Sequence, residues 1–190
     1  MRAGGAKEKG SGWERDVGKQ LSLWLTNGAH PNIFSSNVLS GGAFTVAAKA
    51  GKLSSRMPGD LMAAHPLAFQ FLSQYLIECK HLANLGLENY LFDTSGKAQM
   101  TGIVALATKQ AMQAELEYMI IAKQNHREPL VLVAGYIGQR MLLAHGRSSS
   151  RTIITPNHHY LHKQRIFLMR FRDMLSYVKP TSFLEQSKCD

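Results

Sequence analysis

Three residues whose side chains suit metal chemistry occur in two short motifs. Asp60 ends "PGD", and Glu78 and Lys80 flank the cysteine of "ECK", which closes the apolar run "YLIECKH". Along a strand, alternation points Glu78 and Lys80 to one face and Cys79 to the other. A charged pair at the end of a core strand costs free energy unless something compensates it. These residues are therefore candidates for a functional site rather than for the core.

Two strand-like runs are predicted to bring the motifs together. They are "DLMAAH" (60–65) and "FLSQYLIECKH" (71–81), and "PLAFQ" between them predicts the turn of a β-hairpin. Such a hairpin would place Asp60 near Glu78. Two nearby carboxylates repel, and a bound Mg²⁺ or Mn²⁺ relieves the repulsion and can bind phosphate at the same time. Lys80 could orient or help deprotonate an attacking water and neutralise charge on phosphorus. This chemistry suits phosphodiester hydrolysis.

A fourth acidic residue precedes these motifs on a predicted helix. Residues 11–26 carry Trp13, Val17, Leu21 and Trp24 at helical spacing, which predicts a buried stripe. Ser11 is a plausible N-cap, and Glu14, three residues later, would then complete a capping box. Alternatively, Glu14 borders the buried stripe and points at the end of the sheet.

The two motifs resemble those of the PD-(D/E)XK nuclease superfamily, in which Asp, a Glu or Asp, and Lys form a metal site. A departure is that Gly59 separates Pro58 from Asp60. The preceding helix, with Gly10, Glu14 and Arg15 in a Gly-x-x-x-Glu-Arg arrangement, resembles the Holliday-junction-resolvase branch, including archaeal-type enzymes and phage relatives. The resemblance covers roughly residues 9–136.

This resemblance implies a restriction-endonuclease-like α/β core, a mixed β-sheet flanked by helices. It implies a Mg²⁺- (or Mn²⁺-) dependent endonuclease acting on DNA, and the resolvase branch implies branched DNA. It also implies a homodimer, since junction resolution needs two symmetric cuts. The implied metal ligands are Glu14, Asp60 and Glu78, with Lys80 as a further catalytic residue.

Charge supports a polyanionic partner. The 190-residue chain has a net charge of +9 and a pI near 9.7. Residues 129–172 contain no Asp or Glu but seven Lys or Arg, among them Arg147 and Arg151. An incidentally basic protein would show the same net charge, but a long acid-free segment is typical of a surface kept clear for phosphates.

Weaker candidates for DNA contacts lie on two other segments. The Ser/Gly-rich loop 39–59 offers Ser40, Lys49, Lys52 and Arg56, and could equally be an ordinary loop. A helical pattern from residue 101 to about 124 offers Lys109, Gln110 and Gln113, and a polar helix face is the alternative there. His158, His159 and His162 are better explained as histidines of a basic loop than as zinc ligands.

The remaining pattern predicts a single domain over residues 11–190, preceded by a disordered arm, 1–10. Strands are predicted at 32–38, 129–137 and 165–171, a hairpin partner at 139–145, and a closing helix at 172–178. The sequence contains no run of 18 apolar residues, so no membrane span is predicted. The use of only two cysteines, Cys79 and Cys189, favours a reducing compartment. Together with the resemblance, it implies the cytoplasm of a bacterial, archaeal or phage-infected cell.

Three alternatives to a resolvase stay open at this point. One is another nuclease with the same site, such as a restriction-like, repair or phage DNA-processing enzyme. The second is a DNA-binding module with a degenerate site. The third is a basic structural or ribosome-associated protein that binds RNA without metal.

Overall fold

The computed structural model describes residues 4–37, 58–87, 90, 99–134, 152–154 and 166–184. In chain order, its helices and strands are α1 (Gly4–Leu25), β1 (Phe34–Ser36), β2 (Leu61–Ala63), α3 (Pro66–Leu72), β3 (Tyr75–Leu82), α5 (Gln99–Gln113), β4 (Glu117–Gln124), β5 (Leu130–Ala134), β6 (Thr152–Ile154), β7 (Ile166–Arg170), α7 (Phe171–Tyr177) and α8 (Thr181–Leu184).

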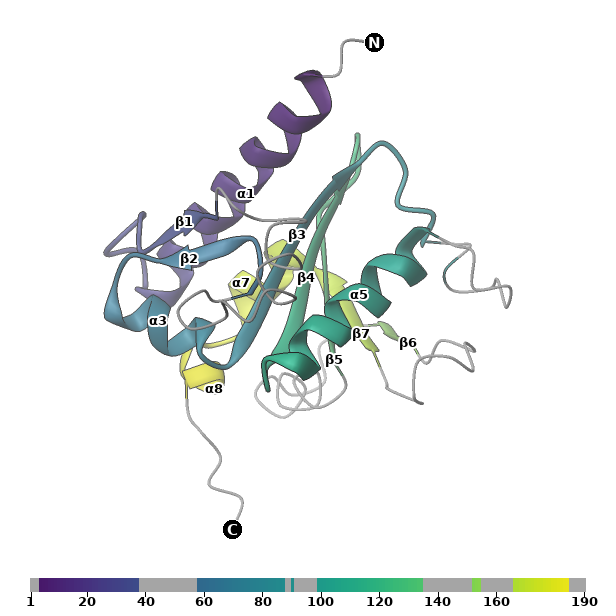
Figure 1. The fold of residues 1–190 in the computed structure, drawn as a ribbon. Helices are drawn as coiled ribbons and strands as arrows, with labels where there is room; N and C mark the ends of the chain where they lie inside the picture. The colour runs from purple at the N-terminus through teal and green to yellow at the C-terminus, as the bar shows by residue number, and fades with distance from the viewer. Residues whose placement is uncertain are drawn as a thin grey trace, which may run out of the picture.

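A five-stranded mixed sheet in the order β3-β4-β5-β7-β6 forms the centre of the molecule (Figure 1). β3 and β4 are parallel, with Glu78 opposite Ile120, and the other pairs in this sheet are antiparallel. β1 and β2 form a separate two-stranded antiparallel sheet. Helices cover both faces of the large sheet, which confirms the predicted α/β fold with a restriction-endonuclease-like core.

Each face of the sheet has its own hydrophobic core. On one face, α1, α3, α7 and α8 pack through Trp13, Leu21, Phe71 and Phe183 against the odd-numbered positions of β3, such as Ile77. On the other face, α5 packs through side chains such as Met100 and Val104 against even-numbered positions, such as Leu76 and Ile120. This alternation separates the two sides of β3, so it decides which neighbours each candidate site residue meets.

The predicted hairpin between residues 60–65 and 71–81 is wrong. β2 pairs with β1, and the segment between β2 and β3 is a helix, α3. The side chain of His65 caps the N-terminus of that helix by accepting from the N–H of Leu67, and Pro66 occupies its first turn. Backbone N–H groups in the first turn of a helix have no acceptor within the helix. Proline, which lacks an N–H, therefore loses no hydrogen bond at this position.

The helix predicted for residues 101 to about 124 is also wrong in its second half. α5 ends at Gln113, and Glu115 adopts a positive φ of 55° in the turn that follows. Residues 117–124 form β4, in which Tyr118 to Ala122 are all buried. A strand covered on both faces has a continuous apolar run, without the alternation that would distinguish it from a buried helix.

Other predicted elements are confirmed, with shifted boundaries. β1, β5, β7 and α7 lie within or close to the ranges predicted from sequence. α1 begins at Gly4, inside the segment predicted to be an arm outside the domain. The predicted strand at 139–145 lies outside the described residues. Among the described residues, no helix is long and apolar enough to cross a membrane.

Candidate active site

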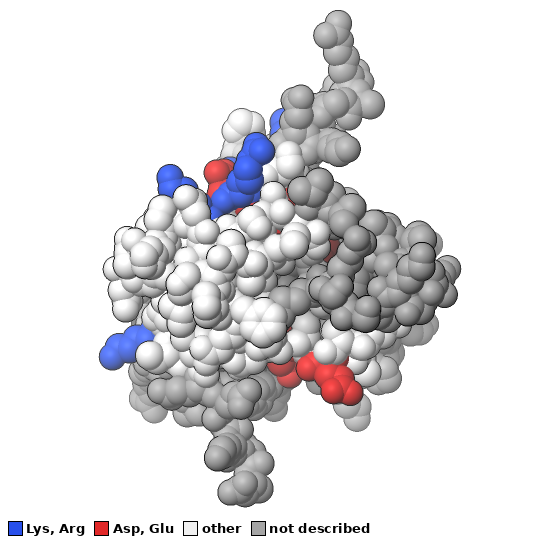
Figure 2. Space-filling view, turned by 60° about the vertical axis from the view of Figure 1, so that its left-hand side comes forward, with Lys and Arg blue, Asp and Glu red and all other residues white. Residues whose placement is uncertain are grey.

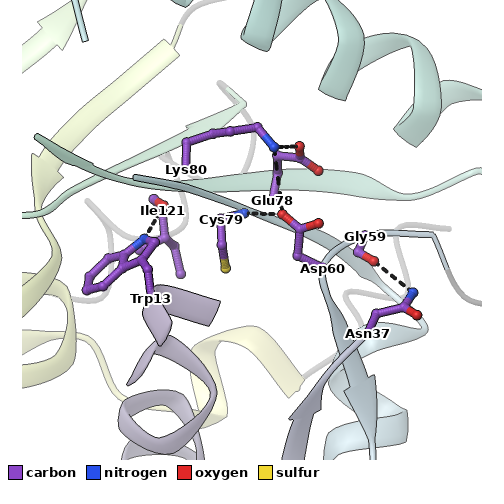
Figure 3. Close-up of polar contacts among 8 residues, drawn as sticks. All are labelled: Trp13, Asn37, Gly59, Asp60, Glu78, Cys79, Lys80 and Ile121. Carbon is purple, nitrogen blue, oxygen red and sulfur yellow. Dashed lines mark hydrogen bonds and ion pairs between the residues drawn. The ribbon is translucent and has the colours of Figure 1, made fainter. Parts of the chain in front are cut away.

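Asp60 lies against the outer edge of β3 and is held there by two hydrogen bonds. Its backbone N–H donates to the carbonyl oxygen of Ile77 over 2.8 Å, and its Oδ2 accepts from the N–H of Cys79 over 2.7 Å (Figure 3). Asn37 fixes the same segment from the other side, since its side-chain amide donates to the carbonyl of Gly59. Hydrogen bonds to the backbone at the edge of β3, and not the pairing of a β-hairpin, therefore hold Asp60 beside that strand.

Gly59, which interrupts the expected Pro-Asp pair, is required by this close approach. Its φ is +107°, a conformation that residues with a Cβ rarely adopt. A Cβ at this position would lie 2.7 Å from the carbonyl oxygen of Ile77. The glycine thus allows the chain to come close enough for Asp60 to bond to β3.

Glu78 and Lys80 lie on β3, on the face covered by α5. Lys80 Nζ forms an ion pair with Glu78 Oε1 and lies 3.8 Å from Asp60 Oδ2 (Figure 3). Glu78 and Asp60 are only 8% and 5% exposed, whereas the side chain of Lys80 is 30% exposed. The two carboxylates are thus presented from inside the protein, with the ammonium group nearer to solvent.

The expectation that these residues lie on an interior strand is wrong. Among the described strands, β3 is at one edge of the five-stranded sheet. Glu78 is nonetheless buried, and the backbone N–H of Asp60 bonds to that edge of β3. The ion pair of Glu78 with Lys80 is therefore partly buried rather than a solvated surface pair.

Glu14 comes to the site from α1. The indole N–H of Trp13, the preceding residue, donates to the carbonyl of Ile121 on β4 over 3.1 Å, which fixes the rotation of the helix (Figure 3). Because α1 begins at Gly4, Ser11 lies inside the helix and the capping-box interpretation of Glu14 is wrong. Glu14 is partly buried, and the charges of Asp60, Glu78 and Lys80 all act on it.

The electrostatics of the site are those of crowded carboxylates. Burial, followed by the negative charge of Asp60, raises the pKa of Glu14 from 4.5 to about 7. The same two causes raise the pKa of Glu78, and Lys80 opposes them. Burial lowers the pKa of Lys80, but the two neighbouring carboxylates outweigh it and raise that pKa above its ordinary value. Lys80 is therefore an ammonium ion in this structure.

This set of donors fits a hard divalent cation. Its three carboxylates offer oxygen ligands, and a cation would offset the burial and the repulsion that raise the pKa values of Glu14 and Glu78. Within the described ranges, no three acidic, histidine or cysteine side chains are already grouped as a ligand cage, and Lys80 pairs with Glu78 and Asp60. The residues available to hold a metal are Glu14, Asp60 and Glu78.

Cys79 and His81 lie on the opposite face of β3, as alternation predicted. Cys79 is buried beside α1, and burial raises the pKa of its thiol, so it is not a nucleophile. The ring of His81 lies edge-on to Trp13 and its Nε2 is 3.1 Å from Asn125 Oδ1.

The weaker candidates are less well placed. Lys109 is exposed on α5 and Gln110 is half-buried there, and neither is among the buried residues of that helix. Gln113 is exposed at the end of α5. The predicted DNA contacts that lie outside the described residues are Ser40, Lys49, Lys52, Arg56, Arg147 and Arg151. His158, His159 and His162, which were predicted to belong to a basic loop, also lie outside them. Sequence reasoning missed the supporting roles of Trp13, Asn37 and Gly59. The role of Gly59 had a signal in the sequence, which is the extra glycine between Pro58 and Asp60 in "PGD".

The fold, the strand-borne Glu78 and Lys80 and the edge-bound Asp60 are the framework of the PD-(D/E)XK endonucleases. A family model confirms this class, since it matches residues 5–185, nearly the whole chain. The chain belongs to the family described as "Phage putative PDDEXK endonuclease". Searches of curated proteins and of solved structures gave no match.

Proposed function

We propose that the protein is a metal-dependent DNA endonuclease that hydrolyses phosphodiester bonds at the Asp60–Glu78–Lys80 site. The observation that carries the proposal is the contact of one lysine ammonium with two buried carboxylates at the edge of β3. Neither burial of the carboxylates nor their mutual repulsion is explained by a role in stability alone.

In this proposal, Glu14, Asp60 and Glu78 hold Mg²⁺ or Mn²⁺. The metal supplies Lewis-acid stabilisation of the phosphate and activation of water. Hydrolysis forms a bond from the water oxygen to phosphorus and breaks the bond to the leaving oxygen, which takes up a proton. Lys80, as an ammonium ion, faces the negative charge that develops on the phosphate oxygens. Asp60 is held in position by the Cys79 amide throughout.

DNA as the substrate is supported by the endonuclease family and by the distribution of charge. α1 carries the exposed basic residues Lys9, Arg15 and Lys19, next to Glu14 in sequence. In Figure 2, several Lys and Arg side chains lie at the upper end of the visible face with an acidic side chain among them, and other acidic side chains lie at its lower end. The sequence of residues 129–172, most of which lie outside the described residues, contains no Asp or Glu, and such a composition suits contacts with phosphates.

Junction resolution by a homodimer is the finer form of this proposal. It is supported by Glu14, since the helix-borne glutamate of the resolvase-like motif is electrostatically coupled to the other three residues. A phage nuclease that cuts duplex or single-stranded DNA is the second candidate, and the family description favours it.

The test compares labelled four-way junction, duplex and single-stranded DNA, each with Mg²⁺ and with a chelator. A resolvase would cut the junction at paired positions and elute as a dimer in size-exclusion chromatography. Cleavage of linear duplex at an equal or higher rate, by a monomer, would favour the second candidate. No cleavage of any of the three substrates with Mg²⁺ or Mn²⁺ would contradict the proposed function.

A further inference from the structure

A pocket of about 690 Å³ opens at the end of the sheet where β3 and β4 finish. β3 and β4 run in the same direction, so their C-terminal ends meet at one end of the molecule (Figure 1). The residues that line the pocket come from the segment after β3, the end of β4, the β4–β5 turn and the end of β7, and they include Leu85, Leu87, Gln124, Arg127, Leu130 and Arg170.

The pocket continues the face of the sheet that carries the candidate active site. Lys80 is opposite Ala122 in the β3–β4 pairing, and Gln124 is two residues further along β4. Because strand side chains alternate, Gln124 lies on the same face as Lys80, and it is displaced by about 7 Å along the strand. The pocket therefore begins two residues along the strand from the level of Lys80.

The rim of the pocket has an excess of positive charge. Glu128 is 3.5 Å from Arg172, and Asp173 is 3.9 Å from Arg170 and 3.7 Å from Arg172. Of these four residues, Glu128 and Arg170 line the pocket, and Arg127 lines it as well, so two guanidinium groups face one carboxylate there. Among the described residues, Arg127 has no carboxylate within ion-pair distance, so its charge is available to an anionic ligand.

The floor of the pocket is apolar and its polar groups are oriented. Leu85 is buried, and Leu87 and Leu130 are half-buried beside it. The Oε1 atom of Gln124 accepts from the N–H of Leu85 over 3.2 Å, which fixes the amide. Apolar surface suits the faces of nucleobases, and guanidinium groups can stack on bases or bind phosphates.

We propose that this pocket binds the nucleotides of the substrate strand that lie next to the cleaved phosphodiester. This inference rests on the proposed function of the Asp60–Glu78–Lys80 site. Continuity with that site and the unpaired charge of Arg127 select a nucleic-acid strand over a protein segment. Arg127 and Arg170 contact phosphate or base, and the leucines provide the surface against which sugar and base pack.

The test measures DNA binding separately from cleavage. Wild type, Arg127→Ala and Lys179→Ala are titrated in EDTA with a labelled DNA strand at several salt concentrations, and each is then assayed for cleavage with Mg²⁺. Lys179 is an exposed lysine that follows α7, outside the pocket, so Lys179→Ala is the charge-matched control. Arg127 is exposed in a turn, so its removal leaves the core intact.

We expect Arg127→Ala to bind about tenfold more weakly than wild type, with a salt slope lower by about one, while Lys179→Ala behaves like wild type. Equal affinities and salt slopes for the two variants would overturn the inference. The same result is expected if a protein segment, rather than DNA, occupies the pocket. Wild type that fails to cleave, with the Arg127 effect on binding intact, would contradict the proposed function while leaving the pocket as a DNA-binding site.

Discussion

The carboxylate of Asp60 accepts a hydrogen bond from the backbone N–H of Cys79 over 2.7 Å, so a side chain completes the edge of a β-strand. The same oxygen is 3.8 Å from the ammonium group of Lys80. Asp60 Oδ2 therefore both bonds to the edge of β3 and faces the candidate reaction centre. The position of this carboxylate is determined by backbone contacts, independently of the other carboxylates of the site.

Replacing Lys80 by Ala should reduce cleavage by roughly 100-fold or more, because the ammonium group facing the phosphate is removed. It should also lower the free energy of unfolding by roughly 1–3 kcal/mol, since two buried carboxylates lose their counter-ion at a partly exposed position. Product formation and thermal melting measure the two effects. Lys109→Ala, an exposed lysine on α5, is the control, and similar cleavage rates in the two variants would remove Lys80 from the site.

Asp60→Asn should fold and lose cleavage by orders of magnitude. The Asn side chain still has an oxygen that can accept from the Cys79 N–H, but the charge that attracts a divalent cation is gone. DNA affinity in EDTA should be unchanged or higher, because a negative charge near phosphate is removed. Gel-shift and cleavage assays on the same preparation test this expectation, and near-normal cleavage would show that Asp60 has only a structural role.

Gly59→Ala should be strongly destabilising and inactive. The added Cβ would meet the carbonyl of Ile77 at 2.7 Å, and φ at this position is +107°. We expect a loss of about 1–3 kcal/mol or more, measured by denaturant unfolding. Gly12→Ala is the matched control, because Gly12 is inside α1 with open space where its Cβ would be, and there the substitution should be neutral or stabilising by up to about 1 kcal/mol. Equal stability of the two variants would contradict the close approach of Gly59 to β3.

Glu14→Gln should change the pH dependence of stability in the metal-free protein. The pKa of Glu14 is about 7 in the folded state and 4.5 when unperturbed, so its favourable contribution is fully present below 4.5 and is lost as the pH rises toward 7. The variant should therefore melt above wild type at pH 8, and the difference should shrink as the pH falls and vanish below about 4.5. Melting curves in EDTA across this range provide the test. A difference independent of pH would mean that Glu14 is not in the crowded environment described.

Sequence reasoning predicted which residues lie together at the site better than it predicted the elements that support them. Glu78 and Lys80 follow from alternation on one strand, which is a local property. The placement of Asp60 depends on β1, which precedes it by more than twenty residues and pairs with β2. Such a non-local pairing leaves no local signal, so a nearby hairpin was the simpler interpretation.

β4 shows a second limit of the sequence pattern. Its residues Met119 to Ala122 are buried on both faces of the sheet, so they lack the alternation of a half-exposed strand and were assigned to the preceding helix. α1 shows a third limit, because its first turns are rich in Gly and Lys and contain few apolar residues. Helix propensity alone gave no reason to begin it at Gly4.

The most direct test of the central claim is the conversion of closed circular plasmid DNA by wild type and by Glu78→Gln, purified in parallel, with Mg²⁺ or with EDTA. Glu78 Oε1 pairs with Lys80, and the substitution keeps the shape of the side chain while removing its charge. The account predicts nicked or linear products from wild type with Mg²⁺ alone, and at least about 100-fold less product from the variant. Products that form at the same rate in EDTA, or from Glu78→Gln, would contradict it.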